Sequence, residues 1–150
     1  PDPLELATHR HNLAEARHAL GHHRHAEQLL EGVISTLEDR LGPGHAELAI
    51  PYKARGSVAL ALGRPEAAEE DLRRSLEIHS RAEQSPVEAA ETRWLHARSL
   101  DALGRRSDAL AQATIAAEEL EGLGPELRED ADEIRAWIRD VSEPTNSRTR

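Results

Sequence analysis

The sequence predicts an all-α fold made of three copies of one helix-turn-helix unit, followed by a single capping helix. The first observation is composition, because 24 alanines and 20 leucines supply most of the hydrophobic residues. Both are strong helix formers, whereas the β-branched and aromatic residues favoured in strands are few. The second observation is an internal repeat with steps of 42 and 41 residues. A period of this length is typical of stacked helical units.

The pair Leu-Gly sets the register of the repeat. Small residues recur at the same steps, and we expect those of the first helix, Ala14, Gly56 and Ala97, to face those of the second, Ala26, Ala68 and Ala109, where the two helices of a unit touch. A leucine in place of Gly56 or Ala68 should therefore destabilise the chain by overpacking. The recurring positions are Leu20-Gly21, Leu62-Gly63 and Leu103-Gly104; Ala7, Ala49 and Ala90; Ala14, Gly56 and Ala97; and Ala26, Ala68 and Ala109.

The repeat predicts helices at about 4–20 and 24–41, 46–62 and 65–83, and 87–103 and 106–122. The glycine of each Leu-Gly pair ends the first helix of its unit, where the chain often needs the left-handed conformation. Pro65 opens a second helix at a position that tolerates proline. Pro51 should kink the first turn of the helix over 46–62.

A seventh helix is predicted at about 126–141, after Gly124-Pro125. One face of it is apolar and the other is charged, so it should close the stack as a polar cap. We therefore expect one domain over 1–141, with repeats at about 4–44, 45–85 and 86–124, and a flexible tail over 142–150. The apolar residues are Leu127, Ala131, Ile134 and Ile138, and the charged ones are Arg128, Asp132, Arg135 and Arg139.

Charge and composition exclude several classes of function. The chain has no cysteine, so disulfides and thiolate chemistry are absent. Its net charge of -9 argues against nucleic acid as a partner. No segment is long and apolar enough to predict a membrane span, and we expect a cytoplasmic protein. The chain begins at Pro1 without an initiator methionine, which indicates a fragment of a longer protein.

Catalysis finds no support in the sequence. There is no phosphate-binding loop, no nucleophile elbow and no zinc-protease motif. The carboxylates instead pair with arginines four residues later, as in Glu69/Arg73 and Glu70/Arg74, which is typical of a solvated helix face. We predict a non-enzyme without a cofactor.

The repeated Leu-Gly and small-residue spacing resembles the tetratricopeptide repeat (TPR). The stretch over 41–49 resembles the longer inter-repeat segment of the kinesin-light-chain-like bacterial subgroup, which is common in signalling proteins. The resemblance implies a right-handed α-α superhelix that serves as a scaffold or regulatory module binding other proteins. The large aromatic often found early in the first helix occurs only as Tyr52, with Arg10 and Arg93 at the matching places.

By the same resemblance, a peptide or a partner helix would bind in the concave groove of the first helices. Only Arg98 fits the clamp with which some members grip a terminal carboxylate, so no clamp is expected here. Trp94 has two interpretations, a buried core residue or an exposed anchor for a partner. The residues that would line the groove are His11, Glu15, His18, Lys53, Ser57, Trp94, Arg98 and Asp101.

A cluster of histidines near the N-terminus leaves two alternatives open. His18 and His22 would share one face if the first helix continued through the Leu20-Gly21 turn, and His22 and His25 lie three residues apart at the start of the second helix, so His18, His22 and His25 are candidates to bind Zn²⁺ or Ni²⁺. The alternative, which we favour, is that they are polar surface residues and bind no metal. The stack also lacks an evident cap at its N-terminal face, so self-association is the third candidate function.

Overall fold

The computed structural model describes residues 1–83 and 85–143, and in this part of the chain every regular element is a helix. The bounds lie within three residues of the predicted ones. The α-helices are α1 (Pro3–Ala19), α2 (His23–Leu41), α3 (Ala49–Ala61), α4 (Pro65–Arg81), α5 (Pro86–Ala102), α6 (Arg106–Leu123) and α7 (Arg128–Ser142), with 3₁₀ turns at Ala46–Leu48 and Pro125–Leu127.

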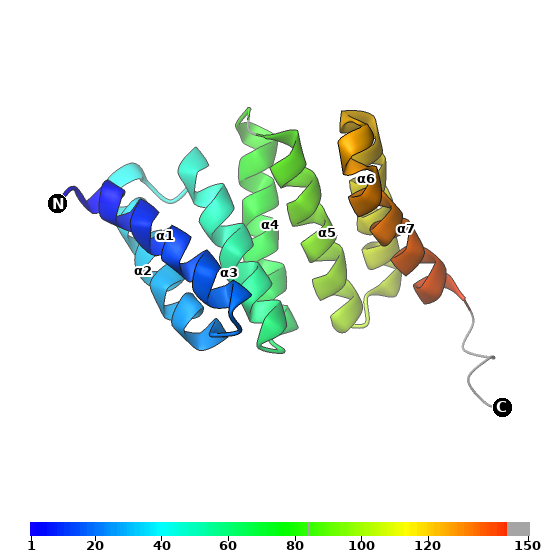
Figure 1. Cartoon of the computed structure of the whole chain (residues 1–150), viewed down its shortest axis with the longest axis horizontal. Helices are drawn as coiled ribbons and strands as arrows, with labels where there is room; N and C mark the ends of the chain where they lie inside the picture. Colours follow the sequence, from blue (N-terminus) through cyan, green and yellow to red (C-terminus); the bar gives the residue numbers. More distant parts are fainter. Residues whose placement is uncertain (84, 144–150) are drawn as a thin grey trace.

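The helices stack side by side in chain order, from α1 at one end to α7 at the other (Figure 1). Each helix packs against the next one, and the first helices of successive repeats, α1, α3 and α5, also touch one another. The all-α helical-repeat solenoid predicted from the sequence is therefore confirmed. None of the helices described is both long and apolar enough to cross a membrane.

The Leu-Gly turns close the three repeats in the same way. In each turn the glycine has a positive φ, between 70° and 82°, where a side chain would be strained. The amide after the glycine donates a hydrogen bond to a carbonyl five residues earlier in the first helix. These bonds run from His22 to Arg17, Arg64 to Ala59 and Arg105 to Leu100, at 2.8 to 2.9 Å.

Pro51 does not kink a continuous helix, which corrects the prediction for 46–62. The segment begins as a 3₁₀ turn over Ala46–Leu48, and α3 begins at Ala49. Pro51 therefore lies in the first turn of α3, where its missing N–H is not needed, and it is buried there.

The small residues of the repeat are all buried, as expected, but one contact differs. A Cβ built at Gly56 would lie 2.6 Å from Cγ of Leu72 on α4. Gly56 thus lies against Leu72, which is one turn beyond Ala68, the residue expected to face it. Ala14 and Ala26 do share one core cluster, so the expected pairing holds in the first repeat.

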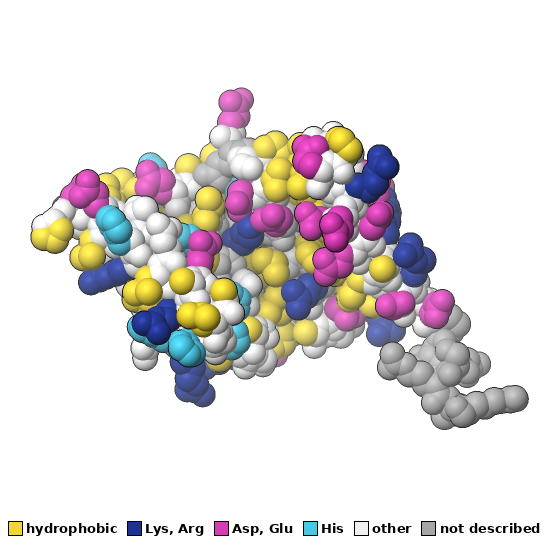
Figure 2. Space-filling view, viewed as in Figure 1, with side chains coloured by type: hydrophobic (Ala, Val, Ile, Leu, Met, Phe, Trp, Pro, Cys, Tyr) yellow, Lys and Arg dark blue, Asp and Glu magenta, His cyan; other side chains and the backbone are white. Residues whose placement is uncertain are grey.

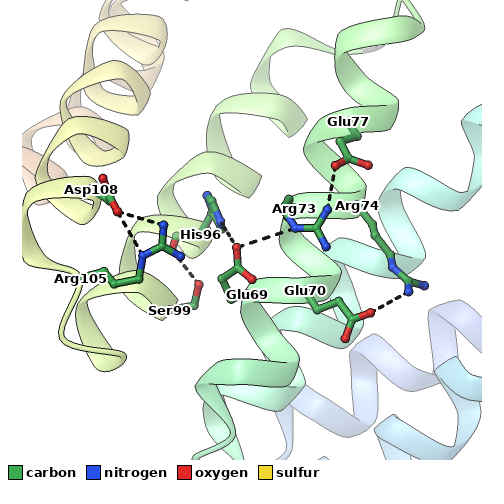
Figure 3. A network of polar contacts seen from close by, with 9 residues as sticks. All are labelled: Glu69, Glu70, Arg73, Arg74, Glu77, His96, Ser99, Arg105 and Asp108. Carbon is green, nitrogen blue, oxygen red and sulfur yellow. Dashed lines mark hydrogen bonds and ion pairs between the residues drawn. The ribbon is translucent and has the colours of Figure 1, made fainter.

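The outer face of α4 is the solvated surface that the sequence indicates. Arg73 pairs with Glu77 at 2.8 Å and lies 4.0 Å from Glu69, while Arg74 pairs with Glu70 at 2.7 Å (Figure 3). From α5, His96 reaches across to Glu69 at 3.1 Å. The row of charges therefore runs along α4 and onto the next repeat.

At the C-terminal end, α7 packs its apolar side against α6. Ala131 and Ile134 are buried in one cluster with the alanines of α5 and α6. On the charged side of α7, Arg135 binds Glu121 of α6 at 3.0 Å. The helix extends through Ser142, and the rest of the expected tail, 144–150, lies outside the described residues.

Candidate binding groove

A cavity of about 220 Å³ opens between α1, α3 and α5. It is smaller than the roughly 300–1,000 Å³ typical of small-molecule sites, which suits a single side chain of a larger ligand. Four of the predicted groove residues, Glu15, His18, Lys53 and Ser57, line it. The apolar lining comes from Ala14, Ala19, Leu30, Ile50, Ala54, Val58 and Leu95, and Glu88 completes the cavity.

His18 connects the first repeat to the second. Its Nε2 lies 3.2 Å from the Ser57 hydroxyl on α3, and its Nδ1 lies 2.9 Å from Nδ1 of His23. Burial, and then the neighbouring His23, hold the pKa of His18 below its usual value. The ring is therefore neutral at pH 7, with one nitrogen that donates and one that accepts.

Lys53 is held between two carboxylates of α5. Its ammonium lies 2.8 Å from Glu88 and also binds Glu91. Burial opposes the charge, but the hydrogen bonds to the two glutamates outweigh it, so the pKa of Lys53 is raised. The lysine links α3 to α5 and leaves one carboxylate charge uncompensated in the groove.

His11 lies apart from this cavity. It lines a neighbouring cavity with Thr8, Ile50 and Pro51, and its Nε2 lies 3.4 Å from Glu15. That second cavity lies nearer the start of α1, so the groove continues along the helix in that direction.

The three predicted groove residues on α5, Trp94, Arg98 and Asp101, do not line the cavity. Trp94 is half-buried and packs edge-to-face on Trp137 of α7, with ring centroids 5.1 Å apart. Arg98 is exposed. Asp101 lies 3.8 Å from Arg106. Trp94 therefore belongs to the contact between α5 and α7, which favours the packed interpretation.

Glu88, Ile50 and Leu95 also line the cavity but were not predicted as groove residues from the sequence. A signal existed for Glu88, since it occupies the same register as Glu5 and Glu47. Ile50 and Leu95 carried no signal, because apolar helix residues near a groove look the same as core residues in a sequence.

The three histidines considered as metal ligands do not converge. The first helix ends at Ala19 and the chain turns at Gly21, so His22 does not continue its face. His18 meets His23 instead, and Nδ1 of His22 lies 3.4 Å from Arg17. Among the described residues, no group of three or more histidines and carboxylates has the spacing to hold a metal ion.

We expect stability to fall as the pH falls below about 6.5, because two half-buried histidines resist protonation. Burial holds the pKa of His79 below its usual value, while Glu88 raises it and Lys53 and Arg93 lower it. With folded pKa values below those of the unfolded chain, the unfolded chain takes up protons first. The contribution of these two neutral histidines to stability is therefore fully present above pH 6.5. It is lost as the pH falls through the lowered pKa values of His18 and His79.

Urea unfolding at pH 7.5 and 5.5 tests this. Neither ring nitrogen of His79 has a hydrogen-bond partner, so His79→Leu should cost little at pH 7.5 and reduce the loss at pH 5.5. His25→Leu changes an exposed histidine and should leave the loss as it is. Equal losses in the wild type and His79→Leu would contradict the prediction.

Comparison with known proteins agrees with this geometry. The family described as Tetratricopeptide repeat matches residues 5–81, which is half of the chain. Among solved structures, the chain is similar to the N-terminal domain of stress-induced protein-1 (STI-1) from C. elegans, with a TM-score of 0.64 at 12% identity, covering 90% of this chain and 98% of that one. No curated protein matches. With helix pairs stacked in this register and the family match over half its length, the chain belongs to the tetratricopeptide repeat family.

Proposed function

We propose that this chain binds an extended peptide or a partner helix along the groove of α1, α3 and α5, with one apolar side chain of the ligand in the cavity. The TPR fold is generally that of a protein-interaction module. The cavity between the three first helices is the observation that carries the proposal, because its lining combines apolar side chains with polar and charged ones.

The charges at the groove indicate the chemistry of the ligand. Lys53 pairs its one positive charge with two glutamates, so one negative charge remains there. Glu15 adds a second exposed carboxylate, one turn from the neutral His18. Figure 2 shows acidic side chains gathered over α5 and between it and α7, around hydrophobic surface. A ligand segment with an apolar residue next to a basic one would complement this surface.

The wider setting is also part of the proposal. We propose that the chain is a regulatory or scaffold part of a larger cytoplasmic signalling protein of a bacterium. The resemblance of the 41–49 stretch to the inter-repeat segment of the kinesin-light-chain-like bacterial subgroup supports this proposal. Metal binding is not proposed, because the histidines do not converge.

A displayed library of random peptides, selected on the wild-type chain, tests the groove. Ala54 lines the cavity, so Ala54→Leu fills it, whereas Ala61→Leu adds the same side chain at an exposed position of the same helix. We expect the selected peptides to be rich in apolar-basic pairs and to bind Ala54→Leu at least tenfold more weakly. They should bind Ala61→Leu as they bind the wild type.

Circular dichroism melts of both variants serve as the control for folding. If the selected peptides bind the two variants equally well, or if no peptide is selected, the groove is not the site.

A further inference from the structure

The outward face of α1 carries a strip of leucines and arginines in alternation. We call Leu6, Arg10, Leu13, Arg17 and Leu20 the α1 strip. Their spacing of four and three residues places them on one helix face, as in the contact positions of a coiled coil. The leucines are 36%, 42% and 71% exposed, although leucine is mostly buried in folded proteins.

The later repeats show what this face normally meets. Leu48, in the register of Leu6, is 0% exposed and packs in one cluster with Val33, Ile34 and Leu37 of α2. Leu62, in the register of Leu20, packs with the cluster that holds Ala26 and Leu30 of α2.

His96, in the register of Leu13, reaches Glu69 of α4 (Figure 3). Leu48, Leu62 and His96 thus each pack against the second helix of the preceding repeat. The second-repeat residue in the register of Leu13 is Arg55, which binds Asp71 of its own repeat instead. Within the described residues no helix fills that place against α1, so an inter-repeat contact is left open.

The charges around the strip point to the kind of helix that would fill it. The strip holds two arginines and no carboxylate, with Arg10 exposed and Arg17 half-buried, so the strip itself is positively charged in a chain of net charge -9. Figure 2 shows basic, histidine and hydrophobic side chains together over α1 and α2. If two copies of α1 met antiparallel about Leu13, Arg10 of one copy would lie near Arg17 of the other. Repulsion between these arginines disfavours a second copy of the chain.

We propose that the α1 strip is a docking surface for an amphipathic helix of a partner protein, apolar at every seventh position and acidic at the positions between. This helix would lie on α1 as α2 lies on α3. Its leucine-type residues would meet Leu6, Leu13 and Leu20, and its carboxylates would pair with the arginines. The surface is separate from the groove, so it can be occupied at the same time.

The probe is a synthetic 21-residue helical peptide with leucine at every seventh position and glutamate between on the same face. A second peptide has lysine in place of those glutamates. Fluorescence anisotropy at low salt should show the glutamate peptide binding at least tenfold more tightly than the lysine peptide. The difference should shrink as salt is raised. Leu13→Gln should weaken the glutamate peptide at least tenfold, and the double variant Arg10→Glu, Arg17→Glu should reverse the preference.

Two control variants separate this surface from others. Ile115→Gln removes an apolar side chain of similar exposure on α6, and Ala54→Leu fills the groove cavity. Both should bind the glutamate peptide as the wild type does, and thermal melts should show all variants folded. The proposal is overturned if neither peptide binds, if both bind alike, or if Leu13→Gln binds unchanged. It is also overturned if the wild type sediments as a dimer that Leu13→Gln dissociates, which would make a second copy the occupant.

Discussion

Replacing Arg55 by methionine is expected to lower the free energy of unfolding by about 3 kcal/mol. Arg55 on α3 donates two hydrogen bonds to the carboxylate of Asp71 on α4, of 2.7 and 2.8 Å. The Asp71 side chain is only 8% exposed, so without the arginine its carboxylate would stay buried with no partner. For a chain of this length the melting temperature should fall by roughly 6–12 °C.

The two partners of this ion pair are not equivalent, and that difference is the control. The Arg55 side chain is 25% exposed, so in Asp71→Asn the guanidinium can still reach water, and the loss should be smaller. In the double variant Arg55→Met, Asp71→Leu no buried charge remains, and most of the loss should be recovered. Urea unfolding measures all three. A double variant as unstable as Arg55→Met would show that the pair matters through packing instead of charge.

At Gly56, alanine is expected to destabilise the chain, although alanine normally stabilises a helix by about 1 kcal/mol relative to glycine. The new Cβ would lie 2.6 Å from Cγ and 2.9 Å from Cδ2 of Leu72, so either the buried Leu72 side chain would have to shift or α3 and α4 would have to move apart. Gly56→Leu adds still more volume and should cost about 1–3 kcal/mol or more.

Gly32 on α2 provides a matched comparison, because a Cβ there would meet nothing within 4 Å. Gly32→Ala should therefore raise stability by about 0.5–1 kcal/mol in the same melts. Combining Gly56→Ala with Leu72→Ala should relieve the clash, so that the pair of changes costs less than the sum of the two alone. If Gly56→Ala were as stabilising as Gly32→Ala, the close approach of α3 and α4 would be wrong.

The helical repeat could be predicted because the same residue types recur along the chain at a nearly constant step. Gly21, Gly63 and Gly104 recur at the step of the solenoid, and each closes its helix with the same backbone bond. The contact of Gly56 with Leu72 was not predictable to the residue. Which side chain faces a small residue depends on the crossing of two helices, and a spacing along one chain does not specify that crossing.

The candidate site shows the same limit. The resemblance to the tetratricopeptide repeat implied that His18, Lys53 and Ser57 line a common groove, and they do come together at the cavity. Their partners could not be predicted, because Lys53 binds glutamates 35 and 38 residues away, and long side chains reach across helices in several directions. Trp94 remained undecided from the sequence since its partner, Trp137, lies in the helix that caps the stack.

The link between α3 and α5 has a chemical consequence. Lys53 is the single lysine among 150 residues, so its ε-amine is the only side-chain amine for acylation. An acyl group would remove the charge that Glu88 and Glu91 share and leave two neighbouring carboxylates of α5 without a cationic partner on α3. One covalent event would thus make the groove more acidic and at the same time release the tie between two neighbouring repeats.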